Sequence, residues 1–116
     1  MISIASTSRI FVFTEPTDMR KSFNGLSGIV AEHFDVELLS GHLFLFFNRR
    51  RDCVKVLAWD RDGLIIWYKR LESGTFEVSP LQSEGTSLEI DHVKLSMLLS
   101  GIDIASAKRR KRFAAA

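Results

Sequence analysis

The chain is 116 residues long, the usual size of one domain, with 46% hydrophobic and 26% charged residues, a balance that excludes general disorder. The formal net charge of +2 is unevenly spread, because five of the sixteen Lys and Arg residues stand together at residues 108–112. We therefore expect one α+β domain over residues 1–107, followed by a basic disordered tail over residues 108–116.

Neither a membrane-spanning nor a secretory segment is visible in the sequence. The longest apolar run is the five residues 43–47, against about 20 for a membrane-spanning helix. The N-terminus has no basic start and no apolar run of the kind found in a signal peptide. A single cysteine, Cys53, cannot form an internal disulfide. We expect a cytoplasmic protein with no membrane partner.

The first half of the chain predicts a strand, a long helix and a second strand. Residues 9–13 are β-branched and aromatic, which is typical of a strand. Either Thr17 or Asp18 can cap the helix. Its apolar positions have the spacing of one helical face and are Met19, Phe23, Leu26, Ile29, Val30 and Phe34. After the turn signal Ser40-Gly41, residues 42–47 predict a buried strand.

The second half of the chain predicts a β-hairpin. Residues 54–59 and 64–71 are strand-like, and the Asp-Gly pair at residues 62–63 between two apolar runs is a strong hairpin signal. The second of these strands is apolar on both faces, so we expect it to be central or covered on both sides. Residues 75–78 predict a further edge strand before Pro80.

A short helix is expected near the C-terminus. Asp91 can cap it and Gly101 can end it. Its apolar positions are Val93, Leu95, Leu98 and Leu99. Together the elements predict an α+β fold with a small, mostly antiparallel sheet of about four or five strands, one long N-terminal helix and one short C-terminal helix.

The sequence offers two weak candidates for catalysis. Asp60 and Asp62 form a close carboxylate pair, which a nuclease could use to bind Mg²⁺, but Asp is also favoured in a hairpin turn, and we favour the turn. Cys53 follows three arginines that could lower its pKa, but without an identifiable histidine partner we interpret it as a strand residue. Standard metal and cofactor motifs are missing from the sequence. We expect neither an enzyme nor a bound metal or cofactor.

The basic clusters predict a polyanionic partner. Residues 48–70 carry seven Lys and Arg against three Asp, whereas residues 71–107 carry one Lys against six acids. Cations that neutralise phosphates release counterions, which gives salt-dependent affinity for DNA. The candidate DNA-binding residues are Arg49, Arg50, Arg51, Lys55, Lys69 and Arg70 and, in the tail, Lys108, Arg109, Arg110, Lys111 and Arg112. The alternatives are a solvated hairpin end for the first cluster and a solubilising tail for the second.

Motifs along most of the chain resemble one family of bacterial mobile-element proteins. They are PTDMRKSFNGL at 16–26, SGHLFLF at 40–46, VKVLAWDRDGL at 54–64, WYKRLESGTF at 67–76 and MLLSGID at 97–103. Over about residues 9–104 the chain is similar to the TnpB accessory proteins of the sixty-six class of insertion sequences, which are encoded beside a separate, larger transposase. The resemblance does not extend to the RNA-guided nucleases of the same name. It implies a role in transposition without the strand-transfer chemistry, and it carries over no catalytic or ligand-binding residue.

Three functions stay open. The first is an accessory protein that binds the DNA of the element ends, the transposase or both, with the acidic residues 71–107 facing a protein partner. The second is a protein-interaction module of the transposase complex that never contacts DNA. The third is a small metal-dependent nuclease that uses Asp60 and Asp62. We favour the first.

Overall fold

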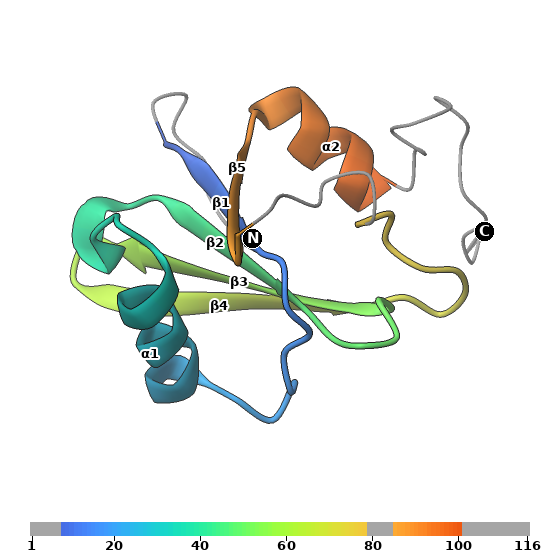
Figure 1. Cartoon of the computed structure of the whole chain (residues 1–116), viewed down its shortest axis with the longest axis horizontal. Coiled ribbons are helices and arrows are strands. Elements are labelled where there is room, and N and C mark those ends of the chain that lie inside the picture. The colour runs from blue at the N-terminus through green and yellow to red at the C-terminus, as the bar shows by residue number, and fades with distance from the viewer. Residues whose placement is uncertain (1–7, 79–84, 101–116) are drawn as a thin grey trace.

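A computed structural model of the chain describes residues 8–78 and 85–100, which form one mixed sheet with helices on both of its faces (Figure 1). In chain order the elements are β1 (Ile10–Phe13), α1 (Phe23–His33), the 3-10 helix η1 (Leu38–Ser40), β2 (Leu43–Phe47), β3 (Cys53–Asp60), β4 (Gly63–Arg70), β5 (Ser87–Ile90) and α2 (His92–Ser100). The predicted α+β class is confirmed.

The five strands of the described chain lie in the order β4-β3-β2-β1-β5. Strands β1 and β2 are parallel, while the other three neighbouring pairs are antiparallel. The expectation of a mostly antiparallel sheet is therefore corrected to a mixed sheet. Two parallel strands need a crossover of a dozen or more residues, and the long connection that contains α1 provides it.

Helix α1 is shorter than the sequence predicted. It has 11 residues and follows Ser22 as its N-cap, so neither Thr17 nor Asp18 caps it and the expectation of a long N-terminal helix is wrong. Of the predicted apolar stripe, Leu26 and Val30 are buried in the helix, and Phe34 is buried directly after it. Met19 lies before the helix and Phe23 is 44% exposed, so the start of the predicted stripe is wrong.

Four hydrogen bonds hold residues 18–21 in a turn before the helix. The Asp18 carboxylate accepts a hydrogen bond from the N–H of Arg20 at 2.9 Å, and the N–H of Lys21 donates to the Asp18 carbonyl at 3.1 Å, so the chain turns here. The Lys55 ammonium donates to the carbonyls of Met19 and Lys21, each at 2.8 Å. In a continued helix these carbonyls would accept bonds from N–H groups four residues further on. The Lys55 ammonium is the donor to these carbonyls in place of those N–H groups.

The sheet buries a different set of side chains on each face, because successive residues of a strand point to opposite sides. The α1 side is rich in aromatic residues, with a core of Phe11, Phe13, Leu26, Val30, Phe34, Phe44, Phe46 and Leu57. Its Phe11 and Phe44 rings stack with centroids 5.5 Å apart. The α2 side is mainly aliphatic, and its core includes Ile10, Val12, Leu45, Val54, Val56, Leu95 and Leu98.

The predicted β3–β4 hairpin is confirmed. All eight residues of β3 pair with β4, from Cys53 opposite Arg70 to Asp60 opposite Gly63. The positive φ of the connecting turn falls on Arg61, at 55°, and not on the glycine. The sequence predicted that this strand is central or covered on both sides, but β4 lies at the edge of the sheet (Figure 1). Its apolar residues 64–67 contact the cores of both faces and are only half-buried.

The C-terminal part of the described chain corrects one prediction and confirms another. Residues 75–78 are not a strand; Phe76 and Val78 pack into the α2-side core, and β5 takes the edge position beside β1 instead. Asp91 caps α2 as predicted, because its carboxylate accepts a hydrogen bond from the N–H of Lys94 at 2.7 Å.

The predicted helix end at Gly101 and the basic tail lie outside the described residues. Within residues 8–78 and 85–100, neither helix is long and apolar enough to cross a membrane.

Candidate nucleic-acid interface

The turn between β2 and β3 is held by one side chain. The Asn48 carboxamide oxygen accepts hydrogen bonds from the N–H groups of Asp52, at 3.1 Å, and of Cys53, at 3.0 Å. Its amide nitrogen donates to the Asp52 carboxylate at 2.6 Å. Three hydrogen bonds from one residue fix the loop that carries the arginine triplet.

The arginine triplet forms the outer part of this turn. Arg49 and Arg50 are exposed, whereas Arg51 is half-buried. Arg51 has a φ of 60°, and its N–H donates to the Asn48 carbonyl at 3.1 Å. The left-handed conformation at Arg51 lies at the point where the chain turns back towards β3, and the two arginines before it are exposed to solvent.

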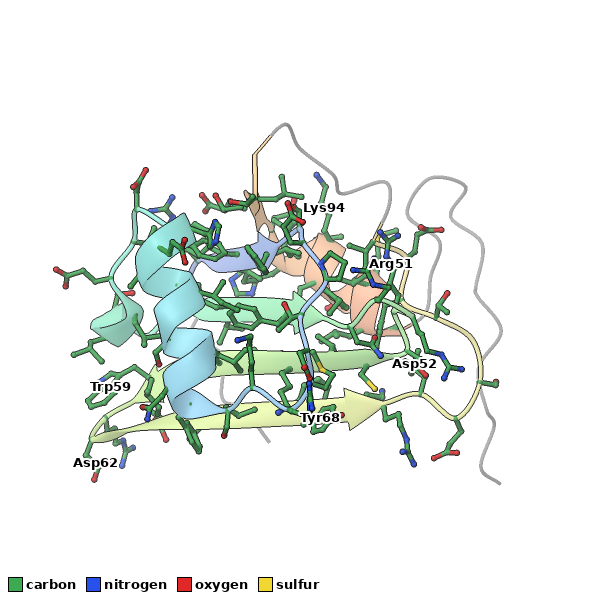
Figure 2. The ribbon with its side chains drawn as sticks, turned by 60° about the horizontal axis from the view of Figure 1, so that its bottom comes forward. Arg51, Asp52, Trp59, Asp62, Tyr68 and Lys94 are labelled. Carbon is green, nitrogen blue, oxygen red and sulfur yellow. The ribbon has the colours of Figure 1, made fainter. Side chains whose placement is uncertain are left out.

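The end of β4 lies beside the turn. Lys69 is opposite Val54 and Arg70 is opposite Cys53 in the β3–β4 ladder. The next residue, Leu71, donates its N–H to the Asp52 carbonyl at 2.7 Å, so the ladder continues to the turn itself. We call this surface the basic end and define it as Arg49, Arg50, Arg51, Lys69 and Arg70. Figure 2 shows Arg51 and Asp52 at this end of the hairpin and Asp62 at the opposite end.

A third segment joins the basic end from the N-terminal side. The N–H of Thr17 donates to the Phe47 carbonyl at 2.8 Å, at the last residue of β2. Residues 16–19 and 48–50 line a groove of about 500 Å³. Arg20 and Lys21, which were absent from the predicted site, are exposed just beyond this groove. In the sequence, the pairing of two consecutive cations, Arg20 and Lys21, is the signal that could have added them to the predicted site.

Two carboxylates, those of Asp18 and Asp52, accompany these cations. The guanidinium of Arg20 bonds the Asp18 carboxylate at 2.6 Å and holds the pKa of Asp18 at about 2. The hydrogen bond from Asn48, with the nearby charge of Arg50, lowers the pKa of Asp52 below its ordinary value. Both acids are therefore ionised at neutral pH and offset part of the local positive charge.

The structure places Lys55 away from the surface that the sequence suggested for it. Its side chain is 8% exposed, and its ammonium is engaged by the two carbonyls of residues 19 and 21. The ammonium also lies 4.8 Å from the centroid of the Tyr68 ring. Lys55 shares a face of β3 with the buried Leu57, an alternation that was readable in the sequence.

Cys53 shows the opposite of an activated thiol. It is buried, and that burial raises the pKa of its thiol. The nearby Arg70 lowers this pKa by less, and the thiol is hydrogen-bonded to Tyr68. Being close to arginines in sequence therefore does not make Cys53 a thiolate.

Asp60 and Asp62 lie at the end of the hairpin opposite the basic end. Asp62 is in the turn between β3 and β4, both residues are exposed, and we call residues 60–62 the acidic turn. Across residues 8–78 and 85–100, no group of three or more His, Cys, Asp or Glu is placed to hold a metal ion.

The sequence comparisons agree with the class that the motifs indicated. Residues 8–109 match the IS66 Orf2-like family, and the chain belongs to this family. Membership implies an accessory role in the transposition of an insertion sequence.

Two similar proteins come from Sinorhizobium fredii (strain NBRC 101917 / NGR234). The uncharacterized protein y4jC is 33% identical over 110 residues, which cover 95% of this chain and 92% of the relative. The uncharacterized protein y4hO is 38% identical over 103 residues, which cover 89% and 88%. No solved structure matches the chain.

Proposed function

We propose that the protein serves transposition by binding the DNA of its insertion sequence through the basic end. The observation that carries this proposal is the meeting of two basic segments that are distant in sequence. The β3–β4 register puts Lys69 and Arg70 beside the turn that carries Arg49 and Arg50. These cations therefore gather at one end of the hairpin, where Lys69 and Arg70 point to opposite faces of β4.

The geometry of the turn suits phosphate binding. A guanidinium presents a planar fork of donors that can contact two phosphate oxygens at once. Asn48 fixes the backbone beneath Arg49 and Arg50, so less conformational freedom is lost when these side chains bind. Contacts of this kind read the DNA backbone and not the base sequence. Selection of the element ends then falls to the transposase, the second partner in this proposal.

Salt dependence of DNA binding tests the basic end. Element-end DNA is titrated with the full chain and with the double variant R49Q/R50Q at several salt concentrations. Loss of two phosphate contacts should reduce the slope of log K against log salt by about 1.8, or about 0.9 per contact. The matched control is Arg61→Gln, which removes one exposed cation at the far end of the hairpin and should leave the slope unchanged. An unchanged slope in the double variant would contradict the proposal.

The tail is a separate part of the proposal. Residues 108–112 are five consecutive cations, whose mutual repulsion an anionic partner relieves. Deletion of residues 108–116 should reduce the salt slope further when combined with R49Q/R50Q. If the deletion changes neither affinity nor slope, the tail has no part in DNA binding.

A second candidate function is a protein-interaction module that assembles the transposase complex. It is favoured by a groove of about 550 Å³ between α1 and η1, whose lining includes Val30, Phe34, Val36, Leu38 and Leu39. Leu39 is 59% exposed. Under this candidate, Leu39→Asp abolishes co-purification with the transposase, and the wild-type protein does not shift element-end DNA even at low salt.

A further inference from the structure

Strand β4 is a long, regular and open edge. Within the described residues it pairs only with β3, and its eight residues span about 26 Å. The ladder with β3 runs without a gap from one end to the other, so no bulge twists the edge away. The strand contains no proline, and its two charged residues are the last two, Lys69 and Arg70. Soluble proteins usually protect such an edge from pairing with another chain.

The middle of β4 leaves apolar side chains partly in water on both faces. Leu64 and Ile66 pack at the border of the α1-side core, and Ile65 and Trp67 do so on the α2 side, but none of the four is buried. Tyr68 is 51% exposed. On the inner neighbour β3, in contrast, all of residues 53–58 are buried. A strand added outside β4 would remove this apolar area from water.

The backbone groups that face the open edge follow from the ladder. Leu71 bonds Asp52, and hydrogen-bonded pairs alternate with non-hydrogen-bonded pairs in an antiparallel ladder. The N–H and C=O groups that point away from β3 are therefore those of Leu64, Ile66, Tyr68 and Arg70. Four evenly spaced residues offer their backbone donors and acceptors to an incoming strand.

The charges along this edge identify the strand that fits. The acidic turn, with two aspartates and Arg61, has a net charge of −1 and lies at one end of β4, whereas Lys69 and Arg70 lie at the other. Of these groups, neither Asp60 nor Asp62 forms an ion pair within 4.0 Å in the described part of the chain, and neither do Lys69 and Arg70. An antiparallel partner with the same sequence would put opposite charges together at both ends, whereas a parallel one would put like charges together.

We propose that β4 pairs antiparallel with β4 of a second copy of this chain, which joins the two sheets into one continuous sheet. The two-fold axis passes at Ile66, which lies opposite Ile66 of the other copy. Leu64 then lies opposite Tyr68 of the other copy, and Asp62 lies opposite Arg70. In this register the outward backbone groups of both strands bond each other, and side chains of the same face meet.

The dimer does not depend on DNA binding. In the dimer Arg70 lies opposite an aspartate of the other copy, while Arg49, Arg50 and Lys69 stay available to phosphates. A monomeric protein that still shows the predicted salt dependence would overturn the dimer and leave the proposed function standing. A dimer that does not bind DNA would overturn the proposed function and leave the dimer standing.

Charge reversal tests the register with the full chain. The wild-type protein should sediment with twice the mass of one chain. Asp62→Arg and Arg70→Asp each place like charges opposite each other at both ends of the interface, and each should raise the dimer Kd about 10- to 100-fold. An equimolar mixture of the two variants restores both opposite pairs, so it should sediment as a heterodimer. The matched control is Lys94→Asp, a charge reversal on α2, which should leave the dimer intact.

Three results would overturn the proposal. They are a wild-type chain that is monomeric at every concentration, single variants that dimerise as well as the wild type, and a mixture that stays monomeric.

Amide hydrogen exchange of the wild-type protein provides a second measurement that needs no variant. The N–H groups of Leu64, Ile66 and Tyr68 should exchange slowly at high protein concentration and faster on dilution, while that of Trp67, which is bonded to β3, stays protected. Fast exchange of these three amides at every concentration contradicts the proposal. So does protection that appears only when the transposase is added, because the edge would then take a strand of the transposase.

Discussion

The two turns of the β2–β3–β4 meander are built in different ways. The turn at residues 48–52 is tied by the Asn48 side chain, lies under residues 16–19 and receives the N–H of Leu71. The acidic turn is closed by the ladder pair of Asp60 with Gly63 and by a contact from the Asp62 N–H to the Asp60 carbonyl at 2.6 Å, and both of its carboxylates are exposed. In the described part of the chain, no side chain ties its backbone in the way that Asn48 ties the turn at residues 48–52. A fixed turn suits a surface that must hold several cations together. A turn with free charges suits a contact that forms only when a partner arrives.

Replacement of Lys55 by methionine should have the largest effect and should loosen the supported end. Methionine keeps the length and the apolar stem of the side chain but lacks the ammonium. The carbonyls of Met19 and Lys21 therefore lose the hydrogen bonds that Lys55 donates to them. We expect a loss of about 2 kcal/mol in the free energy of unfolding, measured by urea denaturation. Lys69→Met, on the exposed end of β4, is the control and should change stability by no more than about 0.5 kcal/mol. Equal stability of Lys55→Met and wild type would mean that Lys55 does not anchor residues 18–21.

Asn48→Ala should have the next largest effect, about 1–2 kcal/mol, because it leaves two backbone N–H groups of the turn without their acceptor. It should also raise the pKa of Asp52, since the hydrogen bond from Asn48 is the main cause of its lowering.

The pH dependence of this variant has a definite sign. A carboxyl whose pKa is lowered by folding adds stability above its unfolded pKa, about 3.9, and loses that contribution as the pH falls through the folded value. The stability difference between wild type and Asn48→Ala should therefore narrow below about pH 4. A difference that is constant or that widens in acid would contradict this account of Asp52.

Arg61→Gly should have the smallest effect and should act in the opposite direction. Arg61 has a φ of 55°, which costs energy for a residue with a Cβ and little for glycine. We expect a gain of about 0.5 kcal/mol, because the flexibility of glycine in the unfolded chain offsets part of the relief. Thermal unfolding measures the change. A clear loss of stability would show that the arginine side chain supports the acidic turn.

The strands of the hairpin were predictable because their signals are local. The alternation of apolar residues and the Asp-Gly pair lie within a few positions of the elements that they define. The parallel pairing of β1 and β2 was not predictable in this way. The parallel pairing depends on the path of residues 16–22 between the two strands. This path is held by the hydrogen bond from Lys55 to the carbonyl of Met19, two residues that are 36 positions apart in sequence.

The candidate site was predictable to a similar degree. A hairpin of this length necessarily returns Lys69 and Arg70 to the start of β3, so their approach to the arginine triplet follows from the two strands. The sequence-based prediction put Lys55 on that surface because of its charge alone. It did not take into account that Lys55 lies on the same face of β3 as the buried Leu57. The short strand β5 was not predicted, because its four residues carry no clear local strand signal. Its position is set by pairing with β1, which is distant in sequence.

The buried thiol of Cys53 has a practical consequence for labelling chemistry. The cysteine thiolate is the nucleophile that attacks maleimides and disulfide reagents, and burial together with a raised pKa keeps the Cys53 thiol protonated and inaccessible at neutral pH. The native chain is therefore expected to react very slowly with such reagents. A cysteine introduced at the exposed Lys69 would be the one that reacts, so a probe could report on the open edge of β4 without prior removal of Cys53.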